Sequence, residues 1–195
     1  MKTIAIRGVV AASACAAALC LTASADSVTQ ERKIAPNEAA PYSSPLAESP
    51  SDGQIVGIME TVNQSEIEAA DLAERKSSNG TVLEFARMAK TDHTDAADRL
   101  SSCNVTSKSG ELNAMFKERT ARTAKRLEKL DGAAFDRAYI AAQVDDHTAV
   151  LDKIDRKFIP AAKSADVSTY LRETRPIIEA HLEHARRIKT ELGTK

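Results

Sequence analysis

The sequence of 195 residues contains no tryptophan, few other aromatic residues (4% in all) and only 7 glycines. Its hydrophobic residues, 43% of the chain, are therefore mostly alanine, leucine, isoleucine and valine. This composition favours helices over sheets, because strands are enriched in aromatic and β-branched side chains. The formal net charge of −1 argues against a nucleic-acid partner, since proteins that bind nucleic acids carry an excess of basic residues to neutralise phosphates.

The first 25 residues are typical of a secretory signal peptide. Two basic residues precede an apolar stretch at 8–21, and Ala-Ser-Ala at 23–25 resembles a cleavage site. Cleavage after Ala25 predicts a periplasmic or secreted protein of 170 residues (195 − 25) with no transmembrane segment. Two of the three cysteines lie in the signal, so only Cys103 remains and an internal disulfide is excluded.

The rest of the chain divides into a tether and a helical domain. Residues 26–52 contain four of the six prolines and no periodic apolar face, which predicts a disordered Pro/Ser-rich segment. From residue 53 to residue 195 the pattern is helical, with interruptions rich in serine, asparagine and glycine. The predicted helices are four long ones at 53–76, 81–103, 133–161 and 167–192, and a shorter basic one at 111–130.

The lengths of the connections predict the topology. The first two long helices are separated by a few residues, as are the last two, so each pair forms an antiparallel hairpin. The connection at 104–131 is long enough to travel back along the bundle. We therefore expect an all-α, ferritin-like four-helix bundle, with two antiparallel hairpins joined by a crossover that contains a short helix.

Each of the four long helices places one polar residue in its inward apolar stripe. These residues are Glu66, His93, His147 and His181, and each follows the alternating spacing of three and four that defines the buried face. Counting from the turns puts the two members of each hairpin at similar heights. Because a buried imidazole or carboxylate costs free energy without a partner, we expect the four side chains to form one polar layer at the waist of the bundle.

Two interpretations of this layer stay open. In the first, the four residues bind a transition-metal ion, either zinc, copper, iron or manganese, with Asp92, Asp146 or His184 as further candidate ligands. In the second, neutral histidines bond to Glu66 and to one another and only fix the helix register. No Glu-x-x-His pair precedes the three core histidines, which argues against a di-iron centre.

Three motifs of the helical part are similar to those of a known family. The chain resembles the bacterial secreted ferritin-like proteins of domain-of-unknown-function family four-one-four-two, often labelled outer-membrane proteins. The resemblance covers about residues 53–192 and implies an exported four-helix bundle, without an established activity. The residues that carry it are Phe85-Ala86-Arg87-Met88 with Asp92-His93-Thr94, Gly132 and Phe135-Asp136-Arg137-Ala138-Tyr139 with Asp146-His147, and Pro176 with His181-Leu182 and Ala185.

Three functions fit this sequence. We favour a non-catalytic binding or structural protein of the cell envelope with a metal site at the waist, and we assign no catalytic residue. The first alternative is a metalloenzyme that acts on oxygen species or metal ions. The second is a scaffold that binds an envelope partner through the basic crossover at Arg119, Arg122 and Arg126. The sequence does not indicate an oligomeric state.

Overall fold

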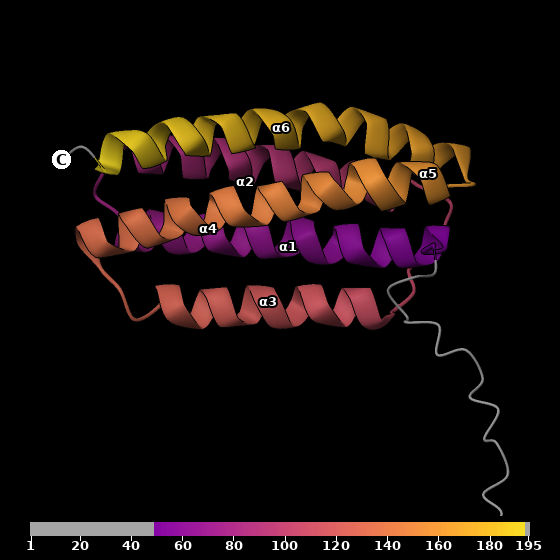
Figure 1. The fold of residues 1–195 in the computed structure, drawn as a ribbon, viewed down its shortest axis with the longest axis horizontal. Helices are drawn as coiled ribbons and strands as arrows, with labels where there is room; N and C mark the ends of the chain where they lie inside the picture. Colours follow the sequence, from indigo (N-terminus) through magenta and orange to yellow (C-terminus); the bar gives the residue numbers. More distant parts are fainter. Residues whose placement is uncertain (1–48, 194–195) are drawn as a thin grey trace, which may run out of the picture. The chain divides into compact units, whose positions relative to one another are not determined.

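The computed structural model describes residues 49–193, and this part of the chain is helical with no strand. Helices α1 (Asp52–Lys76), α2 (Gly80–Ser101), α4 (Gly132–Lys153) and α6 (Ala165–Gly193) form the bundle, and α3 (Glu111–Leu127) is the crossover helix (Figure 1). The predicted all-α bundle is confirmed. The predicted signal peptide and residues 26–48 of the predicted tether lie outside the described residues.

Local signals in the sequence set the starts of the first two helices. The Ser51 side chain accepts a bond from the Gln54 backbone N–H, and the Gln54 side chain accepts one from the Ser51 backbone, which makes a capping box at α1. Asn79 Oδ1 accepts bonds from the backbone N–H groups of Thr81 and Val82 at the start of α2. Because only residues 77–79 separate α1 from α2, the two helices form an antiparallel hairpin.

The second hairpin departs from the predicted continuous helix at 133–161. After α4 the chain makes a π-helical turn, η1 (Ile154–Phe158), and the short helix α5 (Ile159–Ala161), before α6 begins at Ala165. Pro160 has no N–H to donate to the carbonyl four residues earlier, and the wider turn lies directly before it. The periodicity could not predict this interruption, because Ile154 and Phe158 are buried as a regular helix would bury them.

The crossover helix α3 lies along the outside of α1 and runs in the same direction (Figure 1). Near the start of α1, the side-chain amide of Asn113 donates to the carbonyl of Gly57. At the other end of α1, Lys76 Nζ donates to the carbonyls of Glu128 and Leu130. The crossover is therefore attached to α1 at both ends and forms a fifth helix on the bundle.

Gly57 allows the crossover to approach α1, and its replacement should destabilise the fold. A Cβ atom at this position would lie 2.5 Å from the backbone oxygen of Lys108. We expect Gly57→Ala to lower the free energy of unfolding by about 1 to 3 kcal/mol, measured by urea denaturation. Gly80→Ala is the matched control, because nothing lies within 4 Å of a Cβ there, and it should be neutral or stabilising by up to about 1 kcal/mol. Equal effects of the two substitutions would contradict the close approach.

A polar layer divides the apolar core into two clusters. One cluster contains residues from the starts of α1 and α6 and the ends of α2 and α4, and the other contains residues from the opposite ends. The four residues predicted for the waist are buried, with exposed fractions of 2 to 6%. On each helix the polar residue lies between members of the two clusters: Val62, Glu66 and Ala70; Ala96, His93 and Ala89; Val150, His147 and Ile140; Ile178, His181 and Ala185.

None of the described helices is long and apolar enough to cross a membrane.

Candidate metal site

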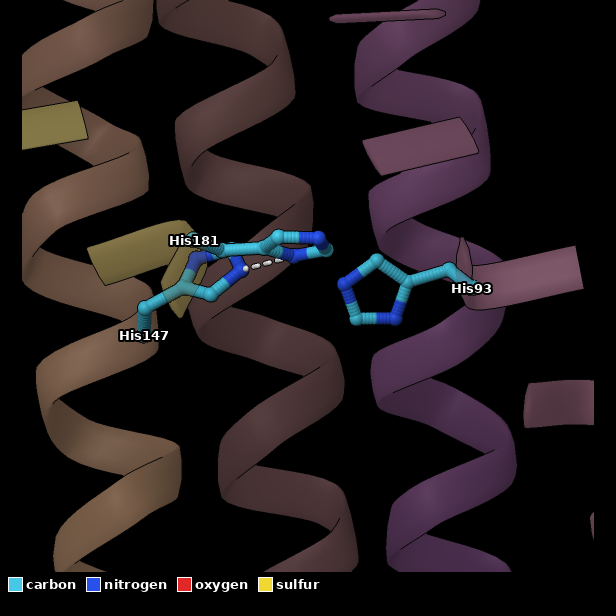
Figure 2. Close-up of side chains that lie close together, drawn as sticks. All are labelled: His93, His147 and His181. Carbon is cyan, nitrogen blue, oxygen red and sulfur yellow. Dashed lines mark hydrogen bonds between the residues drawn. The ribbon is translucent and has the colours of Figure 1, made fainter. Parts of the chain in front are cut away.

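Three histidines from three helices meet in the core of the bundle. His93 on α2, His147 on α4 and His181 on α6 point toward one another (Figure 2). One ring nitrogen of each lies within 4.8 Å of one ring nitrogen of each of the others. The centroids of the rings are 5.4 Å apart for His147 and His181, 5.5 Å for His93 and His181, and 5.8 Å for His93 and His147. We call these three residues the histidine cluster.

Hydrogen bonds on the outer side of the cluster determine where His147 and His181 carry their hydrogens. His147 Nδ1 lies 3.0 Å from the backbone oxygen of Gln143, and His181 Nε2 lies 2.8 Å from Asp92 Oδ2. A carbonyl and an ionised carboxylate can only accept, so each of these nitrogens donates its N–H. A neutral imidazole has a single N–H, and the lone pairs therefore reside on His147 Nε2 and His181 Nδ1. These two atoms face each other at 3.3 Å, with no hydrogen to share between neutral rings.

His93 follows the same rule. Its Nδ1 lies 3.1 Å from Asn63 Oδ1, and the amide nitrogen of Asn63 donates to the hydroxyl of Tyr170 at 3.1 Å. The amide oxygen therefore faces His93, and His93 Nδ1 donates to it. His93 Nε2 is buried and has no hydrogen-bond partner among residues 49–193. Figure 2 shows a ring nitrogen of His93 turned toward the other two rings, so all three histidines direct a lone pair inward.

The separation of the inner nitrogens suits a shared ion. Two nitrogens that are each about 2.05 Å from one zinc ion, at a tetrahedral angle, lie about 3.3 Å apart. The distance between His147 Nε2 and His181 Nδ1 equals this value. The nitrogens of the whole cluster lie within 4.8 Å of one another, so His93 completes a three-nitrogen site by moving closer by up to about 1.5 Å.

Burial keeps the imidazoles in the form that binds metals. Desolvation lowers the pKa of His147 to about 4 and lowers the pKa of His93 well below 6.5. The pKa of His181 is also lowered by burial, although the hydrogen bond to Asp92 acts in the opposite direction. All three rings are therefore neutral at pH 7, and neutral imidazole is the ligand form of histidine.

Glu66 lies on the outer side of His147. Its Oε2 accepts a hydrogen bond of 2.8 Å from the Gln143 amide, and its Oε1 is 3.9 Å from His147 Nδ1, which is the N–H side of the ring. No carboxylate of the described chain joins the group of nitrogens within 4.8 Å. Burial raises the pKa of Glu66, which favours its protonated form. The structure thus places Glu66 in the same layer as the histidine cluster without bringing it to the inner nitrogens.

The three further candidates from the sequence lie around the cluster. Asp92 bonds the outer nitrogen of His181. Asp146 forms an ion pair of 2.7 Å with Arg119 on α3, and burial together with the charge of Glu66 raises its pKa to about 6. His184 is half-buried, one turn beyond His181, and is not part of the cluster. Asp92 therefore orients a histidine, as carboxylates commonly do beside metal-binding histidines, while Asp146 anchors the crossover.

Two residues of the polar layer, Asn63 and Gln143, are not among those predicted from the sequence. Both are buried and each bonds a histidine of the cluster, through the Asn63 side chain and the Gln143 backbone. Their spacing carried a signal. Gln143 precedes His147 by four residues and so shares its helix face, and Asn63 lies three residues before Glu66.

A narrow void lies beside the cluster, on the side of Val62 and Val150. The void next to His93 and His147 has no room for a water molecule. The side chains that enclose this void are Val62, Glu66, His93, His147, Val150 and Ile178.

Comparison with known protein families gives a match over residues 37–188, to the family described as Domain of unknown function (DUF4142). No curated protein and no solved structure matches the chain. The family match includes every helix of the bundle except the last residues of α6, and it contains all three histidines of the cluster. The protein belongs to the DUF4142 family.

Proposed function

We propose that this protein binds one transition-metal ion at the waist of its bundle and serves in the cell envelope as a non-catalytic metal-binding protein. The ligands are His93 Nε2, His147 Nε2 and His181 Nδ1. One observation carries the proposal: each ring has an acceptor on its outer side, and the remaining ring nitrogens form a buried group within 4.8 Å of one another. In metal sites, such outer bonds fix the tautomer and orientation of the histidine ligands.

The ligand set favours zinc or copper. Three neutral imidazoles and no inner carboxylate suit these ions, which bind nitrogen sites more tightly than manganese or iron in the same divalent state. The hydrogen bond from His181 to Asp92 adds the carboxylate–histidine pair that is common in zinc sites. We therefore expect zinc or copper(II), with iron and manganese as weaker occupants.

The narrow void beside His93 and His147 supports binding without turnover. A catalytic metal requires space for a substrate or water at an open coordination position, and the void beside the cluster cannot hold one. The number of protein ligands favours the alternative of a metalloenzyme, because three protein ligands are typical of catalytic zinc. Removal of peroxide or superoxide by the metal-loaded protein would establish the metalloenzyme, and its absence in the presence of bound metal would support the binding protein.

The cellular location in this proposal rests on the beginning of the sequence. Basic residues, an apolar stretch and an Ala-Ser-Ala triplet in the first 25 residues support export and cleavage. Mass spectrometry of the protein from its native cells should find an N-terminus at Asp26. An intact Met1 would contradict export through a cleaved signal.

Metal analysis of the protein purified from its native compartment without chelators tests the site. We expect about one zinc or copper ion per chain, with X-ray absorption reporting three nitrogen neighbours at about 2.0 to 2.1 Å. Added metal should also raise the melting temperature of chelator-treated protein. A content below about 0.1 ion per chain, with no thermal stabilisation by zinc, copper, iron or manganese, would overturn the proposal.

A further inference from the structure

A groove of about 410 Å³ on the surface between α2 and α6 leads toward the histidine cluster. Three side chains with carboxylate or imidazole groups line it, namely Asp92, His181 and His184. The Asp92 side chain is 37% exposed and His184 is half-buried, whereas His181 is buried. The groove therefore presents two accessible ligand groups beside a member of the cluster.

His181 connects this groove to the interior. Its Nε2 bonds Asp92 at the groove, and its Nδ1 faces His147 inside the core. The other two rings have no such link, because the outer nitrogen of His93 bonds the buried Asn63 and that of His147 bonds a helix carbonyl. Of the three histidines, His181 is thus the one that borders both solvent and cluster.

The cleft on the opposite side of the bundle has no imidazole in its lining. This cleft, of about 380 Å³, lies beneath α3 and reaches Glu66 and Gln143. The hydrogen-bonded side chains of Glu66 and Gln143 separate the cleft from His147, whose Nδ1–H is on the side of Gln143. Carboxylates line the cleft too, among them Glu68 and Glu128, and Arg187 lines the groove; the groove differs in holding the imidazole of His184 beside the carboxylate of Asp92.

We propose that a divalent transition-metal cation reaches the histidine cluster through this groove, where Asp92 and His184 bind it first and a turn of the His181 ring, which breaks its hydrogen bond to Asp92, opens the way inward. This inference rests on the proposed metal site. His184 and His181 are one helical turn apart, so an ion bound at His184 lies beside the cluster. Burial lowers the pKa of His184, and the neighbouring positive charge of Arg187 lowers it further, so the ring keeps a free lone pair at neutral pH.

Co²⁺ is a suitable probe, because its visible absorption changes when it exchanges water for nitrogen ligands at a site of lower coordination number. Chelator-treated full-length protein is mixed with Co²⁺ in a stopped-flow instrument, and the dissociation constant is measured separately by titration. His184→Ala should slow loading roughly tenfold, because the ion is no longer concentrated at the groove. Its dissociation constant should equal that of the wild type, with release slowed by the same factor as loading.

Two further variants locate the path. Asp92→Asn keeps an oxygen that can accept from His181 and removes the charge, and it should also slow loading. Glu68→Gln removes a carboxylate from the rim of the opposite cleft and should load at the wild-type rate. Slower loading of Glu68→Gln together with normal loading of His184→Ala would place the path on the other side and overturn the inference.

The outcomes separate this inference from the proposed function. Wild-type protein that binds no Co²⁺, Zn²⁺ or Cu²⁺ contradicts the metal site itself. Wild-type protein that binds one ion per chain, while His184→Ala and Asp92→Asn load at unchanged rates, contradicts only the path. A weaker dissociation constant for His184→Ala with an unchanged loading rate would make His184 a ligand of the final site, which also overturns the path.

Discussion

Replacing His147 with leucine should abolish the stabilisation that zinc gives to the wild-type protein. His147 supplies one of three inward lone pairs, and leucine has a similar size without a ligand atom. A ligand present at a thousand times its dissociation constant stabilises the folded state by about 4 kcal/mol. For a domain of this size that gain corresponds to roughly 8 to 16 °C in melting temperature. Calorimetry of wild type and His147→Leu, each with and without zinc, measures the difference.

Ile154→Ala is the control for this comparison. Ile154 is fully buried on the same side of the bundle and offers no ligand atom. Its truncation should lower the melting temperature by creating a cavity, yet the gain on adding zinc should equal that of the wild type. A zinc gain retained by His147→Leu, or lost equally in Ile154→Ala, would contradict a site built on His147.

The same variant without metal separates the two interpretations of the polar layer. If the histidines only bond to one another and fix the helix register, His147→Leu leaves its hydrogen-bond partners unpaired. It should then destabilise the chelator-treated protein by more than about 1 kcal/mol. If they form a metal site, the metal-free wild type holds two lone pairs against each other at 3.3 Å. Leucine relieves that contact, so we expect His147→Leu to match or exceed the stability of the metal-free wild type.

Periodicity predicted the position of the three histidines because the structure obeys it closely. Residues spaced by three and four face the same side of a helix, so one such histidine per helix had to lie in the core. Short connections then placed the members of each hairpin at similar heights. Because the bundle is narrow, core residues at the same height on different helices necessarily lie close together.

The orientation of each ring could not be predicted from spacing. Which nitrogen of His181 faces inward depends on Asp92, which is 89 residues away in sequence, and His93 depends in the same way on Asn63 of another helix. Glu66 illustrates the limit, since it lies at the predicted level but turns to Gln143. The docking of α3 depends likewise on a contact between distant residues, at Gly57 and Lys108.

Acid should weaken the metal-free protein through His147. Burial lowers the pKa of His147 from 6.5 to about 4, so the unfolded chain takes up a proton before the folded protein does. The stability that this difference provides is fully present above about pH 6.5 and is lost as the pH falls toward 4. This lowering of the His147 pKa on folding corresponds to about 3 kcal/mol in the free energy of unfolding. Burial also lowers the pKa values of His93 and His181, which adds to the loss.

Two carboxyl groups that face His147 act in the opposite direction, so a comparison of variants is required. The pKa of Asp146 is raised to about 6 and that of Glu66 is also raised, both by burial first. Their contributions to stability are present at low pH and are lost as the pH rises through the raised values.

Subtracting the unfolding free energy of His147→Leu from that of the wild type at each pH removes most of this carboxyl contribution. We expect the difference, measured by urea denaturation in chelator, to become about 3 kcal/mol less favourable to the wild type between pH 7 and pH 4. In the Asp146→Asn variant the free energy of unfolding should fall more steeply as the pH is lowered, because the substitution removes a carboxyl group whose pH dependence opposes that of His147. A difference that stays constant over this range would mean that His147 takes up its proton equally readily in the folded and unfolded chains, and would contradict a buried, neutral imidazole.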